Sequence, residues 1–270
     1  MNRNEPLNRD DPSMPADPPP AFEVRGASFG HGTDVFLRDV TLTIAEGEFV
    51  AVLGTNGSGK TTLMRGLLGL LPARTGEVRI CGTPISDFRR WQSVAYVPQR
   101  LLAAGAVPVS VAEVVASARI GAWPIRTRRS DREACAQALA AVGLATHGRQ
   151  RFDGLSGGQQ RRVMVAQALA KGARIFVLDE PTAGVDSAAQ EDLAAIFESL
   201  NQAGATVVLV THELGPFASL AHRVIVMEPG RAGAIGYDGP PPPPGHIDDS
   251  VWHHGHEDEP HDHARGLLQP

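Results

Sequence analysis

The stretch from Phe49 to Leu68 reads FVAVLGTNGSGKTTLMRGLL and contains the pattern G-x-x-x-x-G-K-[ST] between Gly54 and Thr61. The run from Phe49 to Leu53 is apolar throughout, which predicts a strand buried on both faces, and Thr62 to Leu68 predicts a helix. A chance glycine-rich turn would need neither a strand before it nor a helix after it. The order of strand, loop and helix therefore predicts a phosphate-binding loop in an α/β fold.

The glycines of this loop let backbone N–H groups turn inward around phosphate groups, and the positive end of the following helix dipole faces the same charge. We expect the Lys60 amine to reach the β- and γ-phosphates of a nucleoside triphosphate, and the Thr61 hydroxyl to join the shell of a Mg²⁺ ion. The predicted nucleotide contacts in the loop are Gly54, Thr55, Asn56, Gly57, Ser58, Gly59, Lys60, Thr61 and Thr62.

A second apolar run, Ile175 to Leu178, ends in the adjacent carboxylates Asp179 and Glu180. Two solvated acids at a strand end are common, but beside a phosphate loop the pair has a chemical use. We expect Asp179 to be a Mg²⁺ ligand and Glu180 to polarise the water that attacks the γ-phosphate in line. These two motifs together predict hydrolysis of a nucleoside triphosphate.

The composition is that of a globular domain, because 42% of the 270 residues are hydrophobic and the formal net charge is only −5. This charge lacks the basic excess typical of nucleic-acid-binding surfaces, so we expect no nucleic-acid partner. No apolar run approaches the roughly 20 residues of a membrane-spanning helix, and the N-terminus lacks the apolar stretch of a secretory signal. We expect a cytosolic chain in which Cys81 and Cys135 are ordinary reduced thiols.

Composition also divides the chain into three parts. Residues 1–20 are a Pro-rich leader and residues 239–270 a Pro- and His-rich tail, and we expect disorder in both because they have too few apolar residues for a core. The folded domain is expected over residues 21–238, with a helical subdomain at about residues 100–171. Thr206 to Val210 predicts another buried strand, and helices are expected at Val111 to Ala118, Asp131 to Val142 and Gln159 to Leu169.

The segment Leu155 to Gln159 reads LSGGQ. With this segment the chain resembles the ATP-binding cassette (ABC) ATPases, whose signature sequence it matches completely. Ser156 and the backbone N–H groups of Gly157 and Gly158 stand at the expected start of a helix, which is a ready anion site. In the family this site faces the γ-phosphate held by the other subunit. The resemblance therefore implies a head-to-tail dimer of two copies with ATP and Mg²⁺ at the seam.

The resemblance extends over about Phe22 to Asp238 and implies a P-loop NTPase core of the ABC type, with a mostly parallel sheet, an antiparallel β subdomain and a helical insertion. Gln99 resembles the Q-loop glutamine, which senses Mg²⁺ and water. Asp186 resembles the D-loop aspartate at the dimer seam, and His212 resembles the switch histidine that contacts the γ-phosphate. A lone Gln or His is usually an ordinary surface or core residue, but their order here favours the functional interpretation.

The family usually has an aromatic residue near the N-terminus on which the adenine ring stacks, most often a tyrosine followed by glycine. Here the matching pair is His31-Gly32. An imidazole can stack on a base but offers less surface than a phenol ring. His31 is therefore a candidate nucleotide contact, with Phe29 as a nearby substitute and an ordinary surface loop as the alternative.

Three classes of ABC protein compete. DNA-repair and chromosome ATPases need long coiled coils between their nucleotide motifs, but Lys60 and Leu155 are only 95 positions apart and no heptad repeat separates them. RNA-associated members usually carry two cassettes, whereas each motif occurs once here. A transporter subunit remains, and a non-transport ABC ATPase is the less favoured alternative.

With no membrane span of its own, such a subunit docks as a peripheral protein on permease subunits at the cytoplasmic face of the membrane. The resemblance also implies an extracytoplasmic solute-binding protein, which acts through the permease. We expect Leu101 to Trp123, between the Q-loop and the helical insertion, to line the docking groove. Ordinary core packing is the alternative for half or more of its apolar residues.

Two stretches, YVPQR at 96–100 and THELGP at 211–216, resemble the zinc/manganese importer branch of the family. Another small solute, such as an iron chelate, is the alternative cargo. Six of the ten histidines also fall between His246 and His263, among six carboxylates. Imidazole and carboxylate groups are ligands for zinc. The tail is therefore a candidate zinc site or a merely solvated extension, and its candidate ligands are His253, His254, His256, His261 and His263.

Overall fold

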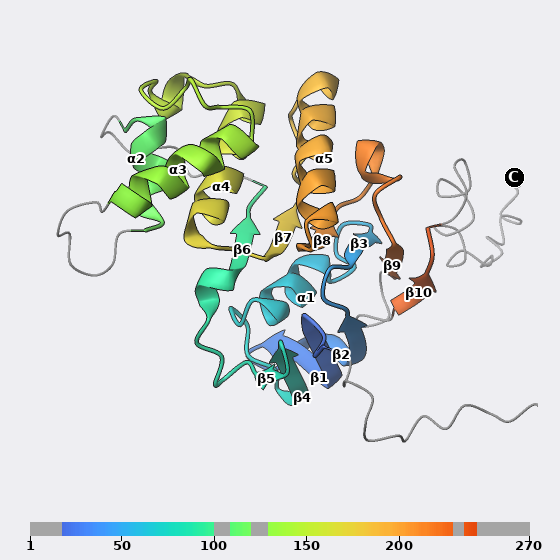
Figure 1. The fold of residues 1–270 in the computed structure, drawn as a ribbon. Helices are drawn as coiled ribbons and strands as arrows, with labels where there is room; N and C mark the ends of the chain where they lie inside the picture. Colours follow the sequence, from blue (N-terminus) through green and yellow to red (C-terminus); the bar gives the residue numbers. More distant parts are fainter. Residues whose placement is uncertain (1–17, 100–108, 120–128, 229–234, 242–270) are drawn as a thin grey trace, which may run out of the picture.

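The computed structural model describes residues 18–99, 109–119, 129–228 and 235–241 (Figure 1). Within these ranges the chain forms a six-stranded sheet, a four-stranded sheet and a group of helices that pack on them. The bounds of the six-stranded sheet are β3 Phe49–Gly54, β6 Val94–Val97, β7 Ile175–Asp179, β8 Thr206–Val210, β9 Arg223–Met227 and β10 Ile235–Gly239.

The six-stranded sheet has the order β10-β9-β3-β8-β7-β6, and all its neighbours are parallel except the edge pair β10 and β9. Side chains of β3 alternate between two cores: Phe49, Ala51 and Leu53 enter one, while Val50 and Val52 enter the other. Burial on both faces explains why this strand is apolar without alternation. Because β3, β7 and β8 are parallel, their carboxyl ends meet at one edge of the sheet, where the functional loops begin.

The four-stranded sheet is antiparallel and has the order β2-β1-β4-β5. Its strands are β1 Phe22–His31, β2 Asp34–Ile44, β4 Thr75–Ile80 and β5 Thr83–Pro84. Helix α1, Lys60–Leu67, packs between this sheet and the parallel one. The contact is close at Gly66, where an added Cβ would lie 2.5 Å from the Phe29 ring, so this core needs a glycine at that position.

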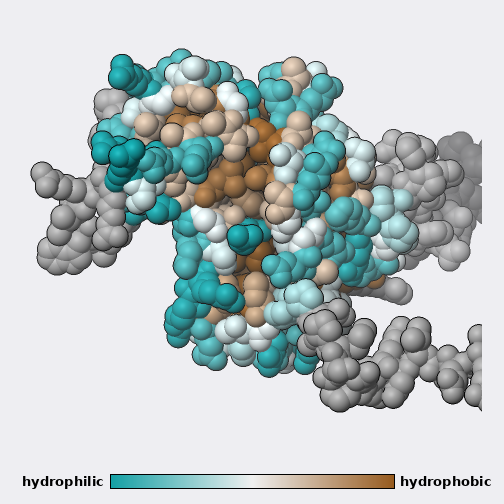
Figure 2. All heavy atoms as spheres, viewed as in Figure 1, coloured by the Kyte–Doolittle hydropathy of each residue, from teal (hydrophilic) through white to brown (hydrophobic). Residues whose placement is uncertain are grey.

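Three helices, α2 Val111–Ser117, α3 Arg129–Ala141 and α4 Gly157–Lys171, pack together as a helical subdomain. Helix α5, Ser187–Gln202, packs on α4 and β8. Short 3-10 turns occur at Trp91–Ser93, Phe152–Gly154 and Gly215–Phe217. Figure 2 shows that polar residues cover the outer surface of the helical subdomain, whereas apolar residues gather between it and α5.

The expected fold class is confirmed: the chain is α/β, with a parallel-rich sheet, an antiparallel sheet and a helical insertion. Three helix starts differ from the expectation, and α3 begins at Arg129 rather than Asp131. The helix after the phosphate loop begins at Lys60 rather than Thr62, because Gly59 takes a left-handed conformation just before it. Helix α4 begins at Gly157 rather than Gln159, because Ser156 caps it.

No helix in the described ranges is long and apolar enough to span a bilayer. Most of the expected leader and tail, residues 1–17 and 242–270, lies outside the described residues.

Candidate functional site

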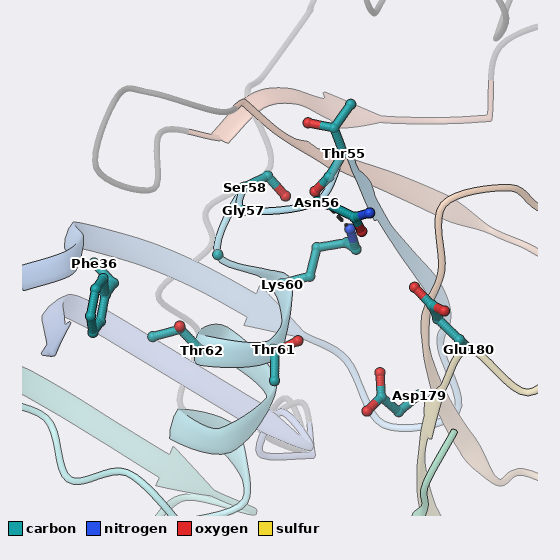
Figure 3. Close-up of a pocket in the computed structure, with 11 residues that line it drawn as sticks. Phe36, Thr55, Asn56, Gly57, Ser58, Lys60, Thr61, Thr62, Asp179 and Glu180 are labelled. Carbon is teal, nitrogen blue, oxygen red and sulfur yellow. Dashed lines mark hydrogen bonds between the residues drawn. The ribbon is translucent and has the colours of Figure 1, made fainter. Parts of the chain in front are cut away.

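The phosphate loop follows β3 and forms, with the end of β7, a pocket of about 310 Å³. Residues that follow β3, residues at the end of β7 and one residue of β2 line this pocket (Figure 3). Gly57 and Gly59 have φ values of +85° and +97°, a region that side chains rarely adopt, so the loop needs glycine there. All the predicted loop residues except Gly54 line the pocket, and they are Thr55, Asn56, Gly57, Ser58, Gly59, Lys60, Thr61 and Thr62.

Lys60 is buried, and its amine folds back onto the loop by donating to the Gly54 carbonyl and, at 3.0 Å, to the Thr55 carbonyl. Burial lowers the pKa of Lys60, while the nearby carboxylates Glu180 and Asp179 raise it. The Ser58 hydroxyl is buried without a hydrogen-bond partner among the described residues. A buried cation beside an unpaired hydroxyl and inward-turned glycine backbone fits a bound phosphate chain.

Asp179 and Glu180 stand at the carboxyl end of β7 and line the same pocket. Glu180 has φ +43°, which for a side chain other than glycine costs on the order of 1 kcal/mol. Its N–H donates to the Val210 carbonyl of β8 at 2.8 Å, which holds this turn in place. The strained turn directs two consecutive carboxylates into one pocket.

Glu180 also brings together the other two predicted catalytic residues. Gln99, which follows β6, donates a side-chain hydrogen bond to the Glu180 carboxylate. His212, which follows β8, has its Nδ1 atom 3.7 Å from Glu180 Oε1. The Thr211 hydroxyl orients the backbone here by donating to the Glu213 carbonyl at 2.7 Å. Three neighbouring strand ends thus deliver a carboxylate, an amide and an imidazole to one point.

Asp179 accepts a hydrogen bond from the Tyr96 hydroxyl at 3.0 Å, which the sequence did not indicate. The pKa of Asp179 is raised mainly by burial, whereas the hydrogen bond from Tyr96 lowers this pKa. Burial and the neighbouring Asp179 raise the pKa of Tyr96 to about 12, so the phenol stays protonated and can donate at neutral pH.

Oxygen ligands for a divalent cation are available at this point of the fold. Figure 3 shows the Thr61 hydroxyl on the side of α1 that faces Asp179. Gln99 uses its amide nitrogen toward Glu180, so this hydrogen bond does not involve its amide oxygen. Hydroxyl, carboxylate and amide oxygens suit Mg²⁺, and a cation is needed wherever carboxylates and phosphates share a pocket. These three residues therefore fit the predicted metal role.

The signature segment caps α4. The Ser156 hydroxyl accepts from the Gln159 N–H at 3.2 Å, and the Gln159 side chain accepts from the Ser156 N–H at 3.1 Å. An added Cβ at Gly157 would meet no atom within 4 Å, whereas one at Gly158 would lie 2.7 Å from Ala189 Cβ of α5. Gly157 therefore leaves the helix start open to a ligand, and Gly158 permits close packing of two helices.

Two further interactions fix the surrounding loops. The buried Arg161 of α4 donates to the Gln99 carbonyl at 3.1 Å and to the Ala183 carbonyl at 2.6 Å. Asp186 caps α5 by accepting from the Ala189 N–H at 3.0 Å. The sequence did not single out Arg161, because an arginine one turn into a helix carries no motif of its own.

Three side chains near the N-terminus, Phe29, His31 and Phe36, are candidates for stacking on adenine, and the structure places them differently. Phe29 is fully buried against α1, so in this conformation it has no free face for a base and is not a substitute for His31. His31 is exposed at the end of β1 but does not line the pocket. Phe36 of β2 does line it and is 49% exposed (Figure 3). The signal that could have pointed to Phe36 in the sequence was an aromatic residue shortly before the phosphate loop.

Other predicted sites lie wholly or partly outside the described residues. The tail histidines, His253, His254, His256, His261 and His263, are among residues 242–270. Only residues 109–119 of the expected docking segment are described. Within the described ranges, no cluster of three or more His, Cys, Asp or Glu residues is arranged to hold a metal ion. Cys81 and Cys135 are free.

A phosphate loop after a parallel strand, two carboxylates at the end of another strand of the same sheet and a capped signature helix together define a P-loop nucleoside triphosphatase with a helical insertion. Residues 37–183, more than half of the chain, match the ABC transporter family. The chain belongs to this family and is one of its ATPases.

Three relatives illustrate the similarity. The zinc transport system ATP-binding protein TroB of Treponema pallidum is 35% identical over 209 residues, 77% of this chain and 78% of that protein. The manganese transport system ATP-binding protein MntB of Bacillus subtilis is 37% identical over 180 residues, with coverage of 66% and 71%. The phosphonates import ATP-binding protein PhnC of Trichormus variabilis is 39% identical over 210 residues, with coverage of 75% and 85%.

Among solved structures, cbiO1 from Clostridium perfringens, part of the ABC transporter complex cbiONQ, is similar with a TM-score of 0.72. It is 25% identical, and the match covers 83% of this chain and 89% of that one. The likeness therefore extends over nearly all of the described fold.

Proposed function

We propose that this chain is the ATP-hydrolysing subunit of a transporter that imports zinc or manganese. The observation that carries the catalytic part is the convergence of Gln99 and His212 on Glu180 beside the phosphate loop. A carboxylate that accepts from an amide and faces an imidazole is suited to orient and polarise a water molecule. Glu180 is the general base in this proposal, and Gln99 and His212 orient it and the γ-phosphate.

The remaining nucleotide contacts follow from the same pocket. The loop backbone and Lys60 bind the phosphates, and Phe36 or His31 contacts the base. Thr61, Asp179 and Gln99 would hold Mg²⁺, which neutralises phosphate charge when it is bound. The phosphate and Mg²⁺ contacts all lie near the edge of the sheet where the parallel strands end, whereas Phe36 and His31 come from the antiparallel sheet.

We propose further that two copies pair head to tail, so that Ser156, Gly157 and Gly158 of one copy complete the site of the other. Support comes from the described lining of the phosphate pocket, to which residues 155–159 contribute nothing. The signature helix nevertheless has an open, capped start with a hydroxyl that can still donate. Gln159 supports the loop by capping it, and Asp186 lies at the seam in this arrangement.

The membrane partners are inferred from the family. We propose that the chain binds at the cytoplasmic face of the membrane to separate permease subunits, which receive cargo from an extracytoplasmic solute-binding protein. A groove of about 360 Å³ supports this docking. Strand β6 and helices α2 and α4 border it, and its lining residues Ser117 and Ala118 belong to the expected docking segment.

The names of two relatives, a zinc and a manganese transport protein, favour a divalent metal as cargo. The phosphonate relative is 39% identical, against 35% and 37% for the two metal relatives, and this observation favours the alternative of another small solute. The two cargo classes differ in charge and size, and transport itself distinguishes them.

The test is uptake into proteoliposomes that contain the chain and permease subunits that co-purify with it, with a metal-binding solute-binding protein outside. We expect ATP-dependent uptake of radioactive zinc or manganese, and none with the Glu180→Gln variant. Uptake of a phosphonate or an iron chelate without either metal would show that the cargo assignment is wrong, and would leave the ATPase assignment intact.

A further inference from the structure

Tyr96 is one of few large apolar residues with an exposed surface in the described chain, at 38%. It lies in β6, the edge strand of the parallel sheet, between the buried residues Ala95 and Val97. Its side chain also lines the groove bordered by β6, α2 and α4, and a partly buried tyrosine hydroxyl usually has a hydrogen-bond partner. The hydroxyl of Tyr96 does have a partner, Asp179 Oδ2, at 3.0 Å.

The register of the sheet explains how these side chains meet. Strands β6 and β7 are parallel, and Tyr96 lies opposite Val177. Side chains two positions apart in a strand point to the same face, so Asp179 lies on the face that Val177 shares. A tyrosine ring that leans along the strand direction therefore carries its hydroxyl to the carboxylate at the strand end. A shorter side chain at position 96 would not reach it.

We propose that Tyr96 is a positioning residue for the metal ligand Asp179. The phenol donates to Oδ2, so Oδ1 is the carboxylate oxygen that this hydrogen bond leaves for a cation in the pocket that Asp179 lines. The χ2 torsion of aspartate is otherwise broadly distributed. A hydrogen bond to one carboxylate oxygen therefore restricts the directions in which the other oxygen can point. Residues that orient a metal ligand through such a hydrogen bond raise the affinity of the site for its metal.

Other charged groups near Asp179 do not replace this contact. Lys60, Arg65 and Glu180 affect its ionisation by charge alone. None of them has a hydrogen bond to Asp179 among those of the described residues, and Lys60 is engaged by loop carbonyls. The orientation of the ligand therefore depends on the Tyr96 hydroxyl. This inference rests on the proposed role of Asp179 as a Mg²⁺ ligand.

The test replaces one hydroxyl. Tyr96→Phe keeps the ring and removes the donor, and Tyr237→Phe is the matched control because Tyr237 is the other tyrosine of the chain, with its hydroxyl bonded to the Pro240 carbonyl at 2.7 Å. Binding of Mn²⁺, as a probe for Mg²⁺, is measured by electron paramagnetic resonance in the presence of ATP. Binding of ATP without metal is measured with a fluorescent analogue.

We expect Tyr96→Phe to weaken Mn²⁺ binding about tenfold, to raise the Mg²⁺ concentration needed for half-maximal hydrolysis equally, and to leave kcat at saturating Mg²⁺ unchanged. Metal-free nucleotide binding should match that of the wild type and of Tyr237→Phe. A Mn²⁺ affinity equal to that of the wild type would overturn the proposal, as would an equal loss of metal-free binding, which indicates general damage. The Asp179→Asn variant distinguishes failure of the Tyr96 proposal from failure of the proposed role of Asp179. If this variant also keeps wild-type Mn²⁺ affinity, Asp179 is not a metal ligand.

Discussion

At the scale of single residues, Glu180 is the predicted catalytic residue that lies next to both of the others, Gln99 and His212. Its backbone takes a left-handed conformation, and its carboxylate meets both Gln99 and His212. Glu180→Gln keeps the shape but removes the base. We expect kcat for ATP hydrolysis to fall at least about 100-fold, with unchanged affinity for a fluorescent ATP analogue. Turnover at the wild-type rate would show that another group activates the water.

Phe36 and His31 are alternative platforms for the adenine ring, and a pair of alanine variants distinguishes them. Phe36 lines the phosphate pocket and His31 does not. Since stacking of a base on an aromatic ring contributes about 1 kcal/mol or more, we expect Phe36→Ala to weaken ATP binding about fivefold or more. His31→Ala should have a smaller effect in the same fluorescence titration. The reverse order would restore the assignment made from the sequence.

Many residues of the candidate site were predictable from the sequence, because they belong to short contiguous motifs that directly follow strands. Lys60, Glu180 and Ser156 follow from motifs whose chemistry is written in consecutive residues. Tyr96 and Arg161 were not predictable, since each acts on a residue more than 60 positions away through the sheet register or a helix crossing. A partner that distant leaves no pattern in a single sequence.

At the scale of elements, the first helix of the helical subdomain depends on its cap. The Ser110 hydroxyl accepts from the Glu113 N–H at 3.3 Å, and Glu113 in turn accepts from Ser110. Ser110→Ala should lower the free energy of unfolding by about 1 kcal/mol in a urea titration. Ser199→Ala, at an exposed position within α5, is the control and should change it little. Equal stability of both variants would show that the cap contributes nothing.

The same cap has a predicted pH dependence. The hydrogen bonds from the Ser110 hydroxyl and then its backbone lower the pKa of Glu113. A depressed carboxyl pKa contributes stability above the ordinary value for glutamate, about 4.3, and this contribution is lost as the pH falls through the lower folded-state value. The difference in stability between the wild type and Ser110→Ala should therefore shrink below about pH 4.

The parallel strands were easier to predict than the antiparallel ones. Strands β3, β7 and β8 are buried on both faces, so their continuous apolar runs stand out. Strands β1 and β2 carry exposed residues between buried ones, and bulges interrupt their pairing, which weakens the alternation in sequence. The antiparallel sheet was expected only from the family resemblance. Helix starts were displaced by about two residues, since caps rather than propensity decide them.

At the scale of the whole molecule, the His-rich tail follows in the sequence every nucleotide contact named here, all of which precede Leu214. We propose that it binds zinc. In calorimetry at neutral pH, the full chain should bind zinc beyond what a chain ending at Pro244 binds, and the difference should disappear near pH 5 because only neutral imidazoles ligate. Basal ATPase activity should stay nearly unchanged on truncation. A full chain with all six tail histidines replaced by serine that binds equally well would contradict the proposal.

A composite site shared by two copies is tested most directly by the mass of the protein in solution, measured by light scattering with ATP present. Glu180→Gln should shift from one chain to two when ATP is added, because bound nucleotide persists at the seam. Glu180→Gln combined with Ser156→Arg should remain a monomer and bind the fluorescent nucleotide as tightly as Glu180→Gln alone. A dimer that forms despite Ser156→Arg, or an equal loss of binding in the monomer, would contradict the head-to-tail arrangement.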